Sequence, residues 1–220
     1  MTYYKVVEIA STYSIFILIV IGCIKIRLRH ATHYFIFLLW LLCSGFFNLL
    51  NAALVVGETN NMFSFHVYTL LELTCLLFFY REILYSSLYR RATMVCLVAF
   101  FVFKGIDILY ITGLRQVDAW AITIESIIVI TFSLLYFAQL PNKSNFNSSQ
   151  NPLFWINAGI LVYFSTSFFI FLFSTPIFGN THQYYTYWSV HDTAIITRDI
   201  LFALAMITLN DSSTRLLLRR

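Results

Sequence analysis

Seven long apolar runs, separated by short polar segments, dominate this chain of 220 residues. A helix needs about 20 apolar residues to cross the roughly 30 Å hydrocarbon core of a bilayer, and each run approaches or exceeds that length. The runs are continuous, whereas the strands of a membrane barrel alternate in polarity. We therefore expect an all-α membrane protein with one domain over 1–220, a bundle of seven transmembrane helices spanning 9–26, 33–56, 64–84, 92–111, 119–138, 153–177 and 190–209.

The composition agrees with a membrane protein and excludes several soluble classes. Hydrophobic residues make up 60% of the chain and charged residues only 11%, whereas roughly a quarter of a soluble domain is charged. Seven spans use roughly 140 positions, so little sequence remains for a soluble catalytic domain, a DNA-binding module or a disordered tail. The lipid bilayer is therefore an expected partner, and nucleic acid is not.

The basic residues of the loops predict an orientation. Lys and Arg accumulate in cytoplasmic loops. On one side of the predicted bundle the basic residues are Lys25, Arg27, Arg29, Arg81, Arg90, Arg91, Lys143, Arg215, Arg219 and Arg220, and on the other side they are only Lys5 and Arg115. We expect the N-terminus outside and the C-terminus in the cytoplasm, in a multi-pass protein of the plasma membrane, with the bacterial cytoplasmic membrane favoured.

Polar residues inside the spans mark the expected site. An ionisable group costs about 2.5 to 3.5 kcal/mol to insert, so it requires a partner or a function. Alternate spans run in opposite directions, and the polar residues of at least five spans then fall in the outer half of the bundle. A polar cavity that opens outward is therefore expected. Its candidate ligand-binding residues are Asn48, Asn51, His66, Tyr68, Glu72, Lys104, Asp107, Glu125, His191, Asp192, Arg198 and Asp199.

Helical spacing predicts which of these residues lie on the same face of a helix. Positions three or four apart share a face. The expected faces are Ser44 with Asn48 and Asn51, Tyr68 with Glu72, Lys104 with Asp107, His191 with Arg198, and Asp192 with Asp199, and the tyrosines expected to line the cavity are Tyr68, Tyr110 and Tyr163. The alternative is that Lys104 and Arg198 are neutralised by Glu72, Asp107 or Asp199 in buried pairs that only fix the helices. Acids would still outnumber cations, which leaves room for protons, a cationic ligand or a metal.

The third run reads NNMFSFHVYTLLELTCLLFFYREIL and carries His66, Tyr68 and Glu72. This motif and the topology loosely resemble small, largely uncharacterised bacterial proteins with seven transmembrane helices, which are similar to sensory regions associated with signalling kinases. The resemblance implies a membrane sensor or receptor-like module. Such a module would bind a small ligand in its outer half and signal through a separate protein partner.

Two other functions stay open. An intramembrane zinc-dependent lipid amidase or hydrolase, similar to alkaline ceramidases, would need His and Asp ligands, here His66, His191 and Asp192. A transporter of protons or small solutes could use the buried acids with Lys104 and Arg198 as a relay. An enzyme is the less favoured class, and no catalytic residue is assigned. No cofactor is expected, since zinc belongs only to the hydrolase hypothesis.

Overall fold

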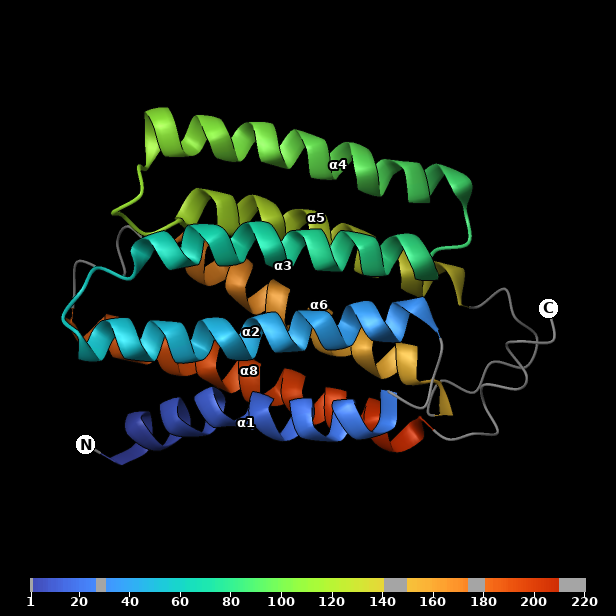
Figure 1. Cartoon of the computed structure of the whole chain (residues 1–220), viewed down its shortest axis with the longest axis horizontal. Helices are drawn as coiled ribbons and strands as arrows, with labels where there is room; N and C mark the ends of the chain where they lie inside the picture. The colour runs from blue at the N-terminus through green and yellow to red at the C-terminus, as the bar shows by residue number, and fades with distance from the viewer. Residues whose placement is uncertain (1, 27–30, 141–149, 174–180, 210–220) are drawn as a thin grey trace.

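The computed structural model of the chain describes residues 2–26, 31–140, 150–173 and 181–209, and all regular structure within these ranges is helical. The helices run nearly parallel or antiparallel to one another in one bundle (Figure 1). They are α1 (Thr2–Ile26), α2 (Thr32–Val56), α3 (Met62–Ile83), α4 (Ser87–Ile106), the π-helical turn η1 (Asp107–Ile111), α5 (Ala119–Gln139), α6 (Pro152–Leu172) and α8 (Thr181–Thr208). The expectation of an all-α bundle is confirmed.

Six of these helices, α1 to α6, are long and apolar enough to cross a membrane, with η1 extending the fourth to Ile111. Helix α8 is outside that set, although it has 28 residues. Its sequence carries Asp192, Arg198 and Asp199, which lower its hydropathy. It nevertheless packs along the bundle, against α1 and α6 (Figure 1).

The helix bounds differ from the expected spans mainly where a helix begins with polar residues. Helix α1 begins at Thr2 instead of residue 9, and α8 begins at Thr181 instead of residue 190. Hydropathy alone cannot find such turns, because their residues are helical without being apolar. Helix α6 ends at Leu172, and the expected end of its run at residue 177 lies outside the described residues.

Six helices form a closed ring, and α4 lies outside it. Around the ring, α1 contacts α2, α2 contacts α3, α3 contacts α5, α5 contacts α6, α6 contacts α8, and α8 contacts α1. Helix α4 lies against α3 and α5 at one edge of the bundle (Figure 1). Its buried residues are only Thr93, Phe100 and Lys104, whereas Val95, Val98 and other apolar side chains of α4 are exposed. This exposed apolar surface is suited to contact with lipid.

Aromatic side chains and close helix approaches hold the ring together. The ring of Phe202 on α8 lies 5.0 Å from that of Phe37 and 5.6 Å from that of Trp40, both on α2. Gly159 allows α6 to approach α8 closely, since a Cβ atom there would lie 2.6 Å from the Phe202 ring. Residues from all six ring helices therefore share one packed core.

The two ends of the bundle differ in charge. Helices α1, α3, α5 and α8 begin at one end, called here the N-terminal end, which carries Lys5 and Arg115. At the opposite end lie Lys25, Arg81, Arg90 and Arg91. The other basic residues assigned to that side by the sequence are Arg27, Arg29, Lys143, Arg215, Arg219 and Arg220, and they lie outside the described residues.

Candidate functional site

A cavity of about 130 Å³ lies inside the ring, in the half toward the N-terminal end. Every ring helix contributes to its wall, and α4 contributes nothing. The lining residues recur at one-turn spacing, as in Trp188, His191, Ile195 and Arg198 of α8. The polar part of the wall consists of Ser44, Asn48, Asn51, Tyr68, Thr69, Glu72, Glu125, Tyr163, Ser167, Trp188, His191 and Arg198.

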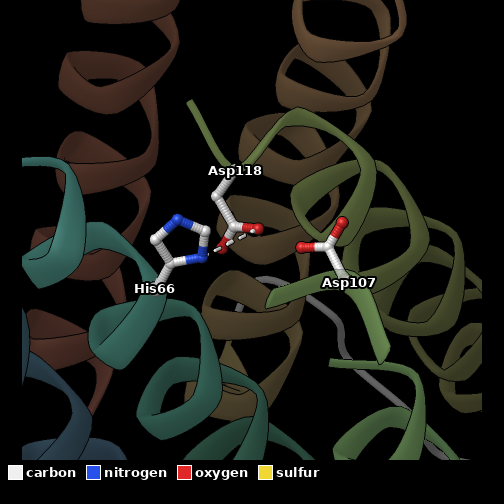
Figure 2. Close-up of side chains that lie close together, drawn as sticks. All are labelled: His66, Asp107 and Asp118. Carbon is white, nitrogen blue, oxygen red and sulfur yellow. Dashed lines mark ion pairs between the residues drawn. The ribbon is translucent and has the colours of Figure 1, made fainter. Parts of the chain in front are cut away.

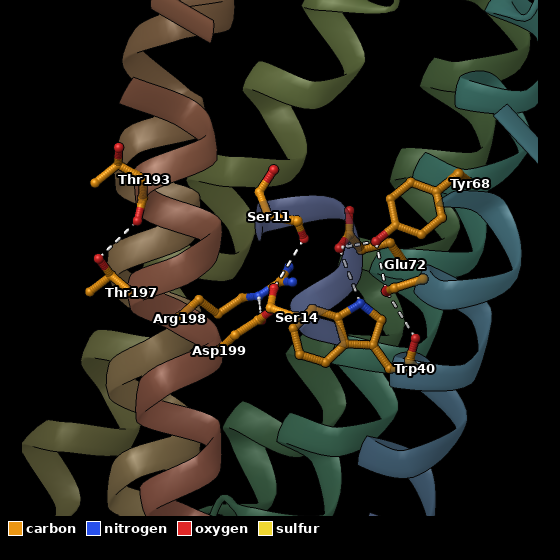
Figure 3. A network of polar contacts seen from close by, with 10 residues as sticks. Ser11, Ser14, Trp40, Tyr68, Glu72, Thr193, Thr197, Arg198 and Asp199 are labelled. Atoms are coloured by element: carbon orange, nitrogen blue, oxygen red, sulfur yellow. Dashed lines mark hydrogen bonds and ion pairs between the residues drawn. The ribbon is translucent and has the colours of Figure 1, made fainter. Parts of the chain in front are cut away.

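Glu72 is held in place on the cavity wall by two donors. Its side chain is 4% exposed, and its Oε1 atom accepts hydrogen bonds from Trp40 Nε1 at 3.1 Å and from the Tyr68 hydroxyl at 2.8 Å (Figure 3). The Tyr68 hydroxyl lies 2.9 Å from Ser44 Oγ. Groups from α2 and α3 therefore fix the orientation of this carboxyl.

Arg198 already has an acid partner and an aromatic enclosure. Its Nε donates to Asp199 Oδ1 at 2.9 Å, and Ser14 of α1 donates to Asp199 Oδ2 at 2.5 Å (Figure 3). The guanidinium carbon lies 4.7 Å from the centre of the Tyr163 ring, and farther from Trp40 and Phe202 at 5.8 and 5.7 Å. The charge is therefore balanced by its neighbour in sequence and stabilised by aromatic rings.

Two buried polar atoms of residues on the cavity wall have no hydrogen-bond partner among the described residues. They are Glu125 Oε1 and His191 Nδ1. The rings of Tyr163, Phe171 and Trp188 surround the imidazole of His191, with centroids 5.6, 6.1 and 5.3 Å away. An unsatisfied buried polar atom costs about 1 to 3 kcal/mol. Water or a ligand bound in the cavity would satisfy the hydrogen-bonding capacity of these atoms.

A second polar cluster joins α3, α4 and α5. The Lys104 ammonium pairs with Asp118 and contacts His66 Nδ1 at 2.9 Å, and all three side chains are buried. Because Nδ1 accepts from Lys104, His66 carries its proton on Nε2 and donates to the Gln116 carbonyl at 3.3 Å. Burial raises the pKa of the Asp118 carboxyl, and the Lys104 ammonium opposes that shift.

Asp107 lies beside this cluster. Its Oδ1 accepts from Thr112 Oγ1 at 2.7 Å, while its buried Oδ2 has no partner among the described residues. One ligand atom each from His66, Asp107 and Asp118 fall within 4.8 Å of one another (Figure 2), which is a spacing that could hold a metal ion. However, the Lys104 ammonium contacts two of the three residues. The cluster thus carries its own cation.

The structure divides the residues predicted for the site among three places. The cavity wall includes Asn48, Asn51, Tyr68, Glu72, Glu125, His191 and Arg198. Asp199 lies behind Arg198, and Asp192 faces α1, where Ser11 donates to it at 3.0 Å. The remaining three, His66, Lys104 and Asp107, belong to the second cluster.

Some expectations require correction. Tyr110 was expected to line the cavity, but it is 82% exposed. It lies in η1, which continues α4, the helix outside the ring. Glu72, Asp107 and Asp199 were named as possible partners of Lys104. This was also wrong, because Lys104 pairs with Asp118. Arg198 pairs with Asp199, one of the acids named for it, but both residues belong to α8, so the pair does not join two helices as that alternative expected. The residues named for zinc do not meet, since His66 joins the second cluster, His191 lines the cavity and Asp192 contacts Ser11.

Two important residues were missed by sequence reasoning. Asp118 directly precedes α5, where an aspartate commonly caps the helix. Its side chain makes no such cap here and pairs with Lys104 instead. Trp40 counts as apolar in a hydropathy plot, yet its indole N–H is the donor to Glu72. The donor capacity of buried tryptophan was the one signal available for it.

No family model matches this chain, and no curated protein or solved structure matches it either. Function depends on a site and its side chains more than on a fold. A function is therefore inferred from the cavity and the second polar cluster.

Proposed function

We propose that this chain is a receptor-like sensor of the cell membrane that binds a small ligand in the cavity and signals through a separate protein. In this proposal α8 is the seventh span, and the membrane is a bacterial cytoplasmic membrane. The N-terminal end faces outward, because the opposite end carries Lys25, Arg81, Arg90 and Arg91 and positive residues favour the cytoplasmic side. The ligand would then enter from outside.

The observation that carries the proposal is the set of unpartnered polar atoms on the cavity wall. Glu125 is 1% exposed and His191 is 8% exposed. Each has an unsatisfied side-chain atom, and both residues line a space bordered by six helices. A ligand that contacts these helices can favour one arrangement of the bundle over another, and this is what a sensor requires.

The volume limits the ligand to a small molecule. An engineered cavity of about 150 Å³ accommodates benzene, and the cavity here measures about 130 Å³. Pockets for drug-sized ligands occupy roughly 300 to 1,000 Å³. The proposed ligand therefore has about six non-hydrogen atoms, which excludes a whole lipid from this space.

The opposite half of the bundle argues against a transport route. A relay through the membrane would continue the line of ionisable groups there. Instead, the Tyr80 hydroxyl donates to Asn157 Oδ1 at 2.9 Å, and Asn157 Nδ2 donates to the Ser133 carbonyl at 3.1 Å. This buried group is neutral and satisfies itself, so it favours a closed inner half.

The test is to fill the cavity. Ser167 lines it and is 2% exposed, so Ser167→Leu replaces a small hydroxyl side chain by a larger apolar one. A library of small amines, amino acids, carboxylic acids and polyols is screened by thermal unfolding of the purified protein. We expect at least one class to raise the melting temperature of the unmodified protein with saturation, and Ser167→Leu to abolish the shift.

The matched control is Thr166→Leu. Thr166 is the neighbouring residue on α6 and does not line the cavity, so its variant should respond to the ligand as the unmodified protein does. The proposal is overturned if no class gives a saturable shift. It is equally overturned if Ser167→Leu responds as strongly as Thr166→Leu.

A further inference from the structure

We infer that the ligand of this cavity is a small organic cation, an ammonium compound of about six non-hydrogen atoms or fewer. The inference deepens the proposed function and rests on it, since it names the chemistry of the ligand. It follows from the balance of charge around the cavity, from the kind of hydrogen-bonding atom left unpaired, and from the aromatic wall.

The charge balance leaves two carboxyls without a cation. Glu72 and Glu125 both line the cavity, and none of the ion pairs in the described parts of the chain includes either residue. Arg198, which also lines the cavity, is paired with Asp199. Buried charge is strongly unfavourable unless it is paired. A bound cation would supply the missing partner.

The unpaired atoms are suited to a donor. Glu125 Oε1 is a carboxyl oxygen, and it accepts a hydrogen bond whenever the group is ionised. His191 Nδ1 can accept one in the neutral imidazole whose proton is on Nε2. An ammonium group provides several N–H donors and no acceptor, so it complements a carboxylate and this form of the imidazole.

Aromatic rings complete the wall. Tyr68, Tyr163, Phe164, Phe171 and Trp188 all line the cavity. The face of an aromatic ring attracts a cation within about 6 Å of its centre, and desolvation strengthens the attraction. The Tyr163 ring already has Arg198 over it, and the other aromatic side chains, combined with the two carboxyls, give a lining suited to an organic ammonium group.

An anion fits this wall poorly, although Arg198 is present. The Arg198 Nε atom is already bonded to Asp199, and Tyr163, Trp40 and Phe202 lie near its guanidinium. An anion in the cavity would also lie beside two carboxyls. The geometry therefore favours a cation.

The test uses three probes with the same carbon chain and different charges: n-butylamine, 1-butanol and butyrate. Thermal unfolding of the purified protein at neutral pH is followed as each probe is titrated. We expect butylamine to give a saturable rise in melting temperature at a concentration about tenfold lower than butanol, because a desolvated cation–π contact and a charge-assisted hydrogen bond add to apolar burial. Butyrate should give the weakest shift.

Variants identify the cavity carboxyl as the source of the preference. Glu125→Gln should abolish the advantage of butylamine over butanol, and Glu82→Gln, at an exposed position near the opposite end of α3, should keep it. If Glu125→Gln does not fold, the comparison of the three probes on the unmodified protein still decides the sign of the charge.

The remaining outcomes separate this inference from the proposed function. Equal shifts with butylamine and butanol, or a stronger shift with butyrate, overturn the cation and leave a ligand-binding cavity in place. A shift with a library acid or polyol but with no library amine and none of the three probes also overturns the cation alone. If neither the library nor the probes give a saturable shift, both proposals fail together.

Discussion

Lys104 connects the outlying helix α4 to buried ionisable groups beside the ring. Helix α4 buries only two other side chains, Thr93 and Phe100. The Lys104 ammonium contacts Asp118 ahead of α5 and His66 on α3, so one side chain joins three helices. Removing one partner of a buried pair leaves the other charge uncompensated, and this is more harmful than removing both.

We predict that Lys104→Met lowers the free energy of unfolding by about 3 to 5 kcal/mol. The reason is that Asp118 loses its cation and the His66 Nδ1 atom loses its donor while both stay buried. The measurement is denaturant unfolding of the purified protein in detergent, followed by circular dichroism.

The double variant Lys104→Met with Asp118→Leu serves as the control. It removes both charges, so it should recover at least half of the stability lost in the single variant. Equal stability of Lys104→Met and the unmodified protein would contradict this account of the pair. A double variant as unstable as the single one would contradict it as well.

At the scale of the helices, two helical glycines differ in how closely other atoms pack around them. A Cβ atom at Gly159 of α6 would lie 2.6 Å from the Phe202 ring and 3.2 Å from the Arg198 carbonyl oxygen. A Cβ atom at Gly105 of α4 would meet nothing within 4 Å. The first glycine sets the distance between α6 and α8, and the second only weakens the helix in which it lies.

We predict that Gly159→Ala destabilises the protein by about 1 to 3 kcal/mol, as overpacking does. It should also weaken ligand binding, because Phe202 and the backbone of Arg198 would have to move. Thermal unfolding with and without the library ligand measures both effects.

Gly105→Ala is the matched substitution and should be neutral or stabilising by up to about 1 kcal/mol, since alanine favours a helix. A loss of stability in Gly105→Ala similar to that in Gly159→Ala would show that close packing of α6 on α8 is not the cause.

Much of the bundle could be predicted from the sequence because apolar runs of span length have few other folded forms. The same signal failed at the first turns of α1 and α8, which are polar. Helical spacing correctly separated His191 and Arg198, which line the cavity, from Asp192 and Asp199, which face α1. Spacing acts within one helix, however, and could not show that Lys104 would meet Asp118 across a loop.

At the scale of the whole molecule, the polar groups are distributed asymmetrically. The cavity and the second cluster lie toward the N-terminal end, where α3, α5 and α8 begin. The basic residues Lys25, Arg81, Arg90 and Arg91 lie at the opposite end. These two features are independent in the sequence, and in the proposed orientation, which rests on the preference of Lys and Arg for the cytoplasm, the cavity would lie on the outer side.

This orientation gives a prediction for the intact cell. In a variant without the four native cysteines, a cysteine placed at Arg115 should react with a membrane-impermeant maleimide added outside, because Arg115 is exposed at the N-terminal end. A cysteine at Arg90, exposed at the other end, should react only after permeabilisation.

A reporter fused after Arg220 should lie in the cytoplasm, because α8 would cross the membrane as a seventh span. Reversed labelling of the two cysteines would place the cavity on the cytoplasmic side, and labelling of both from outside would contradict a spanning bundle. An external reporter combined with the expected labelling would show that α8 packs in the ring without carrying the chain across, since six crossings return the C-terminus to the side of the N-terminus.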